Sequence, residues 1–276
     1  MSADFLATMA AASQARADAA REQASDATLL ARALATPAPP RLQLSAKRFD
    51  LIAEVKLRSP AAGLLSSGTA DVAARVTEYA AAGAAAVSVL TEPSRFDGAL
   101  AHLDLAARAL ARNGSVPAMR KDFLVDPYQL CEARVVGAGG VLLIVRMLKG
   151  DAMQALLEMA ARLHLFVLVE TFDEADIDIA NEIAASPLAR DLQLLIGVNS
   201  RDLTSLKVVS GRLEQLVAGL PATLPRVAES GVGNGDDAAR LAAAGYDMAL
   251  VGSALMTAAD PAQLLRDMLE RGRGAR

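Results

Sequence analysis

The chain has 276 residues, of which 53% are hydrophobic and only 3% are aromatic, and its formal net charge is −4. This length and composition are sufficient for a core built from Ala, Leu and Val side chains. The acidic balance argues against nucleic acid or an anionic membrane as the main partner.

Cysteine usage and hydropathy exclude further classes of protein. Cys131 is the only cysteine, which excludes a disulfide framework and a multi-cysteine metal site, and we expect it in the core. The first residues carry charge throughout, unlike a secretory signal. No apolar run approaches the ~20 residues that span a bilayer, so we expect a cytoplasmic protein.

Residues 1–50 precede the first predicted strand. They are expected to form one or two Ala-rich helices, followed by TPAPPRLQL (36–44), which is typical of a linker. The segment is too short and too rich in Ala to hold a core of its own. We therefore predict an N-terminal helical extension, residues 1–50, packed on one main domain, residues 51–276.

Short apolar runs then alternate with amphipathic stretches. The runs are rich in Val, Ile, Leu or Ala, as strands buried on both faces are. Among the helical stretches, 71–83 ends in Gly83, and 126–140 starts with Asp126 and Pro127, a favourable N-cap and N1 pair. Stretches 151–163 and 236–245 are similar. The runs are LIAEV (51–55), AAAVSVL (84–90), VPAM (116–119), GVLLIV (140–145), LFVLVE (165–170), LQLLIGV (192–198), PRVAE (225–229) and MALVG (248–252).

Eight strand-then-helix units of this size predict a parallel sheet. Their number favours a closed barrel, so the predicted fold class is α/β, a single (β/α)8 TIM barrel with an N-terminal helical extension. An open doubly wound sheet is the alternative. It would normally carry a G-x-G-x-x-G turn after its first strand, and that motif is absent here.

Polar side chains fall at the ends of six predicted strands, where active sites of such barrels form. Glu54 and Lys56 are two residues apart, so in an extended chain both share a face with Ile52. Any one of these groups alone is more often a solvated charge or an ordinary turn residue. Their joint occurrence on one rim favours an active site. The groups are Glu54 and Lys56; Lys121, between Arg120 and Asp122; Glu170; Asn199 and Arg201; Glu229, Ser230 and Gly231; and Gly252 and Ser253.

The last two strands carry a candidate phosphate site. AESGV (228–232) and VGSAL (251–255) each place Gly beside Ser where a helix is about to start. In many barrels these two loops bind phosphate through backbone N–H groups. The alternative is a pair of serine helix N-caps, but the repetition on adjacent strands favours phosphate.

The charges on this rim suit an anionic substrate. Lys56, Lys121 and Arg201 form a cationic rim, and Glu54, Glu170 and Glu229 oppose it. We expect pairing to keep the lysines charged, while burial pushes their pKa values down towards a working range. This arrangement serves proton transfers on a small molecule that carries carboxylate and phosphate. There is no metal-ligand spacing and no nucleotide loop, so we expect neither a metal nor a cofactor.

Eight segments, in chain order from the first predicted strand to the C-terminus, resemble the indole-3-glycerol phosphate synthase family. They are IAEVKLRSP, SVLTEPSRFDG, MRKDFLVDPYQ, VLLIV, LVET, IGVNSRDL, VAESGV and LVGSALM. The leading DFLATMAAASQARA also resembles the N-terminal extension of that family. The resemblance implies a cofactor-free barrel that closes 1-(o-carboxyphenylamino)-1-deoxyribulose 5-phosphate to indole-3-glycerol phosphate, carbon dioxide and water, in tryptophan biosynthesis.

The resemblance also implies roles for the catalytic residues. Lys121 would be the general acid that activates the substrate carbonyl. Lys56 would hold the anthranilate carboxylate and assist proton transfer, and Glu170 would serve the later proton transfers and the dehydration. Glu54 and Glu229 would position the lysines and balance their charge.

The remaining family positions would bind the substrate. Asn199 would hydrogen-bond the intermediate, Arg201 would support the site, and Phe96 and Phe123 would pack on the aromatic ring. The phosphate would be held by Ser59, Ser230, Gly231, Gly252 and Ser253.

Two departures from the family pattern lie near the expected site. Ala61 and Ala62 stand where the family commonly has Ser and Lys, and Phe172 follows Thr171 where the family often has His. They leave open a divergent phosphate-binding barrel with a shifted substrate, or a barrel that binds a ligand without turnover. A phosphoribosylanthranilate isomerase is a weaker alternative, because its chemistry favours Cys or Asp on the first strand and Asp on the sixth. A monomer without nucleic-acid or membrane partners is our working expectation.

Overall fold

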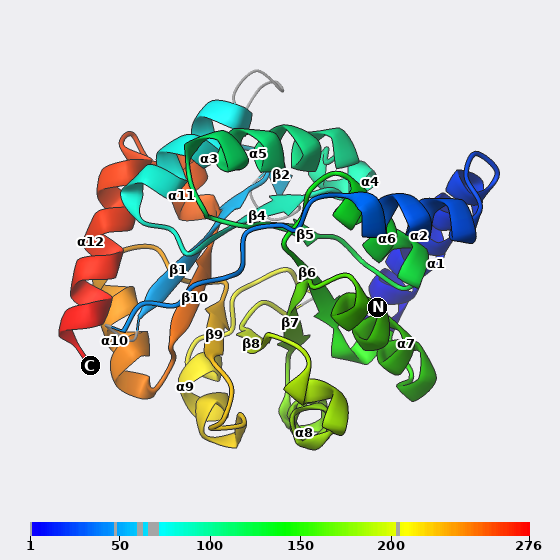
Figure 1. Ribbon diagram of the computed structural model, residues 1–276. Helices are drawn as coiled ribbons and strands as arrows, with labels where there is room; N and C mark the ends of the chain where they lie inside the picture. Colours follow the sequence, from blue (N-terminus) through cyan, green and yellow to red (C-terminus); the bar gives the residue numbers. More distant parts are fainter. Residues whose placement is uncertain (1, 47–48, 60–62, 66–71, 203–204) are drawn as a thin grey trace.

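The computed structural model describes residues 2–46, 49–59, 63–65, 72–202 and 205–276 (Figure 1). Within these residues eight parallel strands form a closed barrel in the order β1-β10-β9-β8-β7-β6-β5-β4. The predicted TIM barrel is therefore confirmed. The strands are β1 (Asp50–Val55), β4 (Ala86–Leu90), β5 (Ala118–Lys121), β6 (Gly140–Ile144), β7 (Phe166–Thr171), β8 (Leu194–Asn199), β9 (Arg226–Glu229) and β10 (Met248–Val251).

Helices follow the strands and surround the barrel (Figure 1). Asp126 caps α6 through a capping box with Gln129, as its sequence predicts, but the helix ends at Val135 because Gly137 takes a left-handed φ of +89°. The longer helices are α3 (Val72–Ala82), α5 (Leu100–Asn113), α6 (Pro127–Val135), α7 (Gly150–Arg162), α8 (Glu174–Ala185), α10 (Gly235–Ala244) and α12 (Pro261–Gly274). The short ones are α4 (Pro93–Phe96), α9 (Arg212–Leu216), α11 (Ser253–Thr257), and the 3-10 turns η2 (Val145–Met147), η3 (Pro187–Arg190) and η4 (Val217–Gly219).

Two details differ from the prediction. The third strand of the barrel, β5, starts two residues later than the VPAM run and continues through Arg120 and Lys121. A short antiparallel pair, β2 (Arg58–Ser59) and β3 (Gly63–Leu64), follows β1 and was not predicted. Two-residue strands carry no hydrophobic period, so no sequence pattern marks them.

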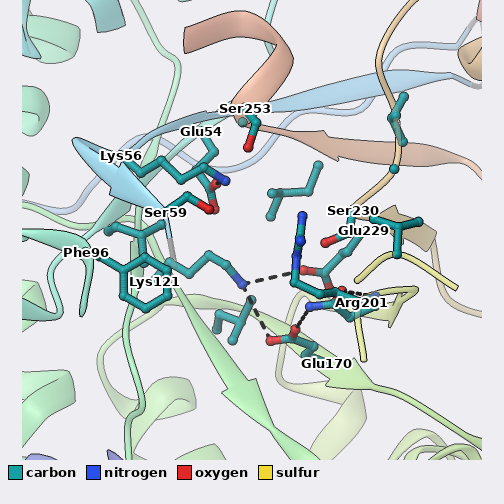
Figure 2. Close-up of a pocket in the computed structure, with 18 of the residues that line it drawn as sticks. Glu54, Lys56, Ser59, Phe96, Lys121, Glu170, Arg201, Glu229, Ser230 and Ser253 are labelled. Carbon is teal, nitrogen blue, oxygen red and sulfur yellow. Dashed lines mark hydrogen bonds and ion pairs between the residues drawn. The ribbon is translucent and has the colours of Figure 1, made fainter. Parts of the chain in front are cut away.

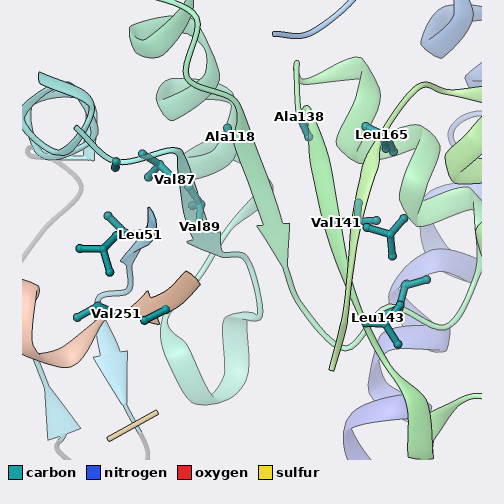
Figure 3. Close-up of a cluster of buried hydrophobic side chains, with 14 of the residues drawn as sticks. Leu51, Val87, Val89, Ala118, Ala138, Val141, Leu143, Leu165 and Val251 are labelled. Atoms are coloured by element: carbon teal, nitrogen blue, oxygen red, sulfur yellow. The ribbon is translucent and has the colours of Figure 1, made fainter. Parts of the chain in front are cut away.

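Alternation along the strands separates two hydrophobic clusters. One fills the barrel interior, with a residue from every strand: Ile52, Ala86, Met119, Leu142, Leu168, Leu195, Val227 and Met248. The other lies between strands and helices and includes Leu51, Val87 and Val141 (Figure 3). The buried Cys131 belongs to the same cluster. Because successive side chains point to opposite faces, the next inward residue above Ile52 is Glu54. The interior face thus leads directly to polar groups at the strand ends.

The N-terminal helices α1 (Ser2–Arg21) and α2 (Asp26–Ala35) lie beside α6 (Figure 1). The hydroxyl of Tyr128 donates to the carbonyl of Ala20 at 2.9 Å, and Arg21 pairs with Asp126 at 2.6 Å. Buried residues of α1 recur at helical spacing, as expected of a helix docked by one face: Leu6, Met9, Ser13 and Ala17. The division into 1–50 and 51–276 as separate units stays a prediction. Among the helices in the described ranges, none has the length and apolar character required to cross a bilayer.

Helix α12 packs against β1 and against Phe49, the residue before that strand, and Gly272 makes the second contact possible. A Cβ atom at this position would overlap the buried ring of Phe49, whereas a Cβ at Gly274 would meet nothing within 4 Å. We expect Gly272→Ala to lower the free energy of unfolding by about 1–3 kcal/mol through overpacking. Gly274→Ala, the control on the same helix, should be neutral or up to about 1 kcal/mol stabilising. Urea unfolding measures both, and equal effects would contradict the steric account.

Candidate active site

A cavity of about 430 Å³ opens at the carboxyl ends of the strands (Figure 2). Every strand of the barrel contributes to its wall. All the residues predicted from sequence for catalysis or binding line it: Glu54, Lys56, Ser59, Phe96, Lys121, Phe123, Glu170, Asn199, Arg201, Glu229, Ser230, Gly231, Gly252 and Ser253. The co-localisation expected from strand ends is therefore present. Across the described ranges, no group of three or more His, Cys, Asp or Glu side chains is arranged to hold a metal ion.

Glu54 on β1 and Lys56, the residue that follows this strand, both face the cavity, as their spacing predicts. The Lys56 ammonium donates to Glu54 Oε1 at 2.6 Å, and both side chains are largely buried. Gly252 follows the neighbouring strand β10, and a Cβ atom there would overlap the Glu54 carboxylate and approach Lys56 Nζ. This glycine therefore makes room for the ion pair.

Lys121 lies between two buried carboxylates. Its Nζ is 3.5 Å from Glu170 Oε2 and 3.6 Å from Glu229 Oε2 (Figure 2). The Asn199 amide donates to the other oxygen of Glu170, and the carbonyl oxygen of that amide accepts from the backbone N–H of Arg201 at 2.9 Å. Three strands thus hold one lysine and its two partners in a fixed arrangement.

The electrostatics of this cluster correct one expectation. Burial alone would lower the pKa of Lys121, but the attraction of Glu170, Glu229 and Glu54 outweighs burial and raises that pKa above its usual value. The expected downward shift is therefore wrong for Lys121. Pairing dominates because more than one carboxylate faces the same ammonium.

The crowding of carboxyl groups that keeps Lys121 charged favours the neutral form of Glu229. Burial, with repulsion from Glu170, raises its pKa to about 8 against the attraction of Lys121. Within the described part of the chain, neither of its carboxyl oxygens accepts a hydrogen bond. The raised pKa favours the protonated form of Glu229 at neutral pH. The cluster thus holds a charged ammonium and a neutral carboxylic acid side by side.

One wall of the cavity is aromatic. The ring of Phe123 lies 5.9 Å from that of Phe5, edge-on, and 6.3 Å from that of Phe96. Phe5 comes from α1 and was missed from the sequence. In the sequence it is only a large apolar residue beside Leu6 in an Ala-rich stretch, which marks no site. The N-terminal helix therefore contributes directly to the cavity.

Phe172, one of the two departures from the family pattern, also lines the cavity. The Arg146 guanidinium lies 4.5 Å from the centroid of its ring. The backbone N–H of Phe172 donates to Asp176, which accepts from Arg146 as well. These contacts hold an apolar ring at this position. The other departure, Ala61 and Ala62, lies outside the described residues.

The far end of the cavity is formed by the loops after β9 and β10. Ser230 and Gly231 both have left-handed φ angles, +67° and +77°, and Ser253 begins α11. Neither serine caps a helix, because Asn234 caps α10 and Gly252 precedes α11 without a side-chain cap. The alternative of two serine N-caps is therefore wrong.

Comparison with known proteins identifies the family. The family profile described as indole-3-glycerol phosphate synthase matches residues 6–268. The chain belongs to the indole-3-glycerol phosphate synthase family. The indole-3-glycerol phosphate synthase of Rhodococcus opacus (strain B4) is 40% identical over 261 residues, 93% of this chain and 92% of the relative. That of Mycobacterium tuberculosis (strain CDC 1551 / Oshkosh) is 39% identical over 261 residues, 93% of this chain and 91% of the relative.

Solved structures support the barrel fold of this synthase family member. A 3-hexulose-6-phosphate synthase from Salmonella typhimurium aligns with a TM-score of 0.61 at 13% identity, covering 82% of this chain and 100% of that one. A thiamine phosphate pyrophosphorylase from Pyrococcus furiosus aligns with a TM-score of 0.57 at 16% identity, covering 83% and 98%. At such identities the likeness concerns the fold alone.

The raised pKa of Glu229 makes stability depend on pH. The unfolded chain releases this proton near pH 4.5, whereas the folded chain keeps it until about pH 8. Between these values the unfolded state binds fewer protons, so the free energy of unfolding falls as pH rises. The free energy of unfolding should fall by at most about 1.4 kcal/mol per pH unit, the value for one proton. Glu229→Gln should remove this loss. The variant should therefore resist urea better than the wild type at pH 8 and equally at pH 4.

The control is Glu270→Gln, an exposed glutamate on α12, which should follow the wild-type curve. Urea midpoints at several pH values measure all three proteins. If Glu229→Gln lost stability in parallel with the wild type, the carboxyl group of Glu229 would be ionised at neutral pH, and the account of the cluster would be wrong.

Proposed function

We propose that the chain converts 1-(o-carboxyphenylamino)-1-deoxyribulose 5-phosphate to indole-3-glycerol phosphate, carbon dioxide and water. It is a carboxy-lyase of tryptophan biosynthesis, as its family membership indicates. The observation that carries the proposal is the position of Lys121. Its ammonium is held between Glu170 and Glu229 inside a cavity with an aromatic wall.

The cavity offers matching surroundings for each part of this substrate. The rings of Phe96 and Phe123 suit the anthranilate ring, and Lys56 suits its carboxylate. The phosphate group suits the other end of the cavity, which serines and glycines line. We assign that end to Ser59, Ser230, Gly231, Gly252 and Ser253.

In the first step, Lys121 donates a proton to the carbonyl oxygen of the substrate while the aromatic ring attacks the carbonyl carbon. A carbon–carbon bond forms, and the charged ammonium, with its pKa raised by its carboxylate partners, is in the correct protonation state. Lys56, paired with Glu54, orients the carboxylate that then leaves as carbon dioxide when the ring regains aromaticity.

Dehydration then requires an acid and a base in close proximity. Glu170, 3.5 Å from Lys121, is positioned to accept a proton from the methylene carbon of the new ring. The Lys56 ammonium is positioned to donate a proton to the hydroxyl group on the neighbouring ring carbon, which leaves as water while the double bond forms. Asn199 fixes the orientation of Glu170 through its amide, and Arg201 supports Asn199 from the backbone. The neutral form of Glu229 limits repulsion around the base.

Two finer expectations accompany this function. We propose that the protein acts as a monomer in the cytoplasm. Light scattering after gel filtration tests the monomer, and a mass of twice 28.6 kDa would overturn it.

The decisive test uses the absence of tryptophan from the chain, which gives indole emission a quiet background. Purified protein mixed with the substrate should show rising indole fluorescence. Lys121→Ala should reduce the rate by roughly 10²–10⁴-fold, as expected for loss of a general acid. Lys149→Ala, an exposed lysine after β6, should behave like the wild type.

Binding of the substrate separates the alternatives. If the wild type binds the substrate without turnover, the chain is a binding barrel or has a shifted substrate, and the proposed function is wrong. If Lys121→Ala keeps full activity, the role of Lys121 is wrong although the activity stands.

A further inference from the structure

Arg16 of the N-terminal helix reaches two buried carboxylates beside the active site. Its guanidinium lies 2.8 Å from Asp122 and 3.8 Å from Glu92. The side chains of Asp122 and Glu92 are each 1% exposed, while that of Arg16 is 31% exposed. Among the described residues, no other basic group lies within 4.0 Å of Glu92. Arg16 is therefore a bridge between two charges that are otherwise shielded from water.

Asp122 stands between Lys121 and Phe123 in the sequence and holds that segment in place. One carboxyl oxygen accepts from the backbone N–H of Phe123 at 2.9 Å, and the other accepts from Thr91 at 2.7 Å. Arg120 approaches the same carboxylate at 3.4 Å. The course of the chain from Lys121 to Phe123 thus depends on the position of the Asp122 carboxylate.

Glu92 controls the segment that carries Phe96. It caps α4, and its carboxylate accepts from the backbone N–H groups of Ser94 and Arg95 at 2.9 and 2.7 Å. Phe96 is the last residue of α4. A buried carboxylate without a cation nearby is costly, so removal of Arg16 would favour movement of Glu92 towards water and, with it, of α4.

We propose that Arg16 is a positioning residue for the reaction. By bridging Glu92 and Asp122, it sets the positions of Phe96, Phe123 and Lys121 relative to one another. The N-terminal helix would then act on the aromatic wall and the general acid through one guanidinium, in addition to contributing Phe5. The expected effect on the reaction rate rests on the proposed function. The expected effect on the positions of Phe96 and Phe123 does not.

The chain offers a matched control for this proposal. Arg21 lies on the same helix, is 29% exposed, and pairs with Asp18, Asp26 and Asp126. It anchors α1 without touching Glu92 or Asp122. A role limited to docking α1 would therefore make substitutions of Arg16 and Arg21 equivalent, whereas a positioning role would separate them.

The kinetic experiment compares Arg16→Gln, Arg16→Lys and Arg21→Gln with the wild type, and urea midpoints record the stability of each. Displaced catalytic groups cost up to about 10²-fold in rate. We expect Arg16→Gln to lower kcat/KM by about 10-fold to 100-fold, with most of the loss in kcat.

Arg16→Lys should be intermediate, because a lysine is a point charge that cannot span both carboxylates. Arg21→Gln should stay within about twofold of the wild type at a similar loss of stability. Equal kinetic losses in Arg16→Gln and Arg21→Gln, or none in Arg16→Gln, would overturn the proposal.

A second experiment does not require turnover. The chain has six phenylalanines, which can be labelled with 4-fluorophenylalanine and assigned with Phe→Leu variants by fluorine NMR. In Arg16→Gln, the signals of Phe96 and Phe123 should shift or broaden, while those of Phe49 and Phe166 stay unchanged. Arg21→Gln should leave all four unchanged. Unaltered Phe96 and Phe123 signals in Arg16→Gln would overturn the proposal even if the protein proved inactive as a synthase.

Discussion

The ammonium of Lys121, held between Glu170 and Glu229, is the interaction on which the active site depends. Two carboxyl groups buried at the top of a barrel would repel each other and would favour water over the interior. The lysine offsets this repulsion, and the carboxylates in turn keep the lysine charged in a place where burial would otherwise neutralise it. Burial, with repulsion from Glu170, raises the pKa of Glu229 and favours its protonated form beside the charged lysine. A site that holds a charged ammonium beside a neutral carboxylic acid suits a reaction with several proton transfers.

The backbone leaves room for this cluster. Gly197 on β8 and Gly252 after β10 lack the Cβ atoms that would overlap Glu229 and Glu54. Because both glycines occupy inward positions of the strands, the carboxylates can extend across the barrel mouth from neighbouring strands. The N-terminal helix completes the arrangement with Phe5 against Phe123. The barrel supplies the charges, and the helix that precedes it closes the aromatic side.

Much of this was predictable from the sequence, for identifiable reasons. Ile52, Glu54 and Lys56 share one face because side chains of a strand repeat every two residues. The strand ends of a parallel barrel meet on one rim. What could not be predicted depends on distances between elements far apart in sequence. The upward pKa shift of Lys121 requires knowing that several carboxylates surround it, and Phe5 requires knowing where α1 docks. The bridge from Arg16 to Asp122 joins residues separated by 106 positions, and no local pattern marks it.

A titration of the glutamate carboxyl groups tests the charge cluster most directly. Protein labelled with carbon-13 at the glutamate carboxyl carbon would be followed by NMR from pH 4 to pH 10, with Glu229→Gln to assign the signal. The account predicts one carboxyl group that titrates near pH 8 and is absent from the variant. If every glutamate of the wild type had already lost its proton below about pH 6, as ordinary carboxyl groups do, there would be no neutral carboxylic acid beside Lys121, and the central claim would be contradicted.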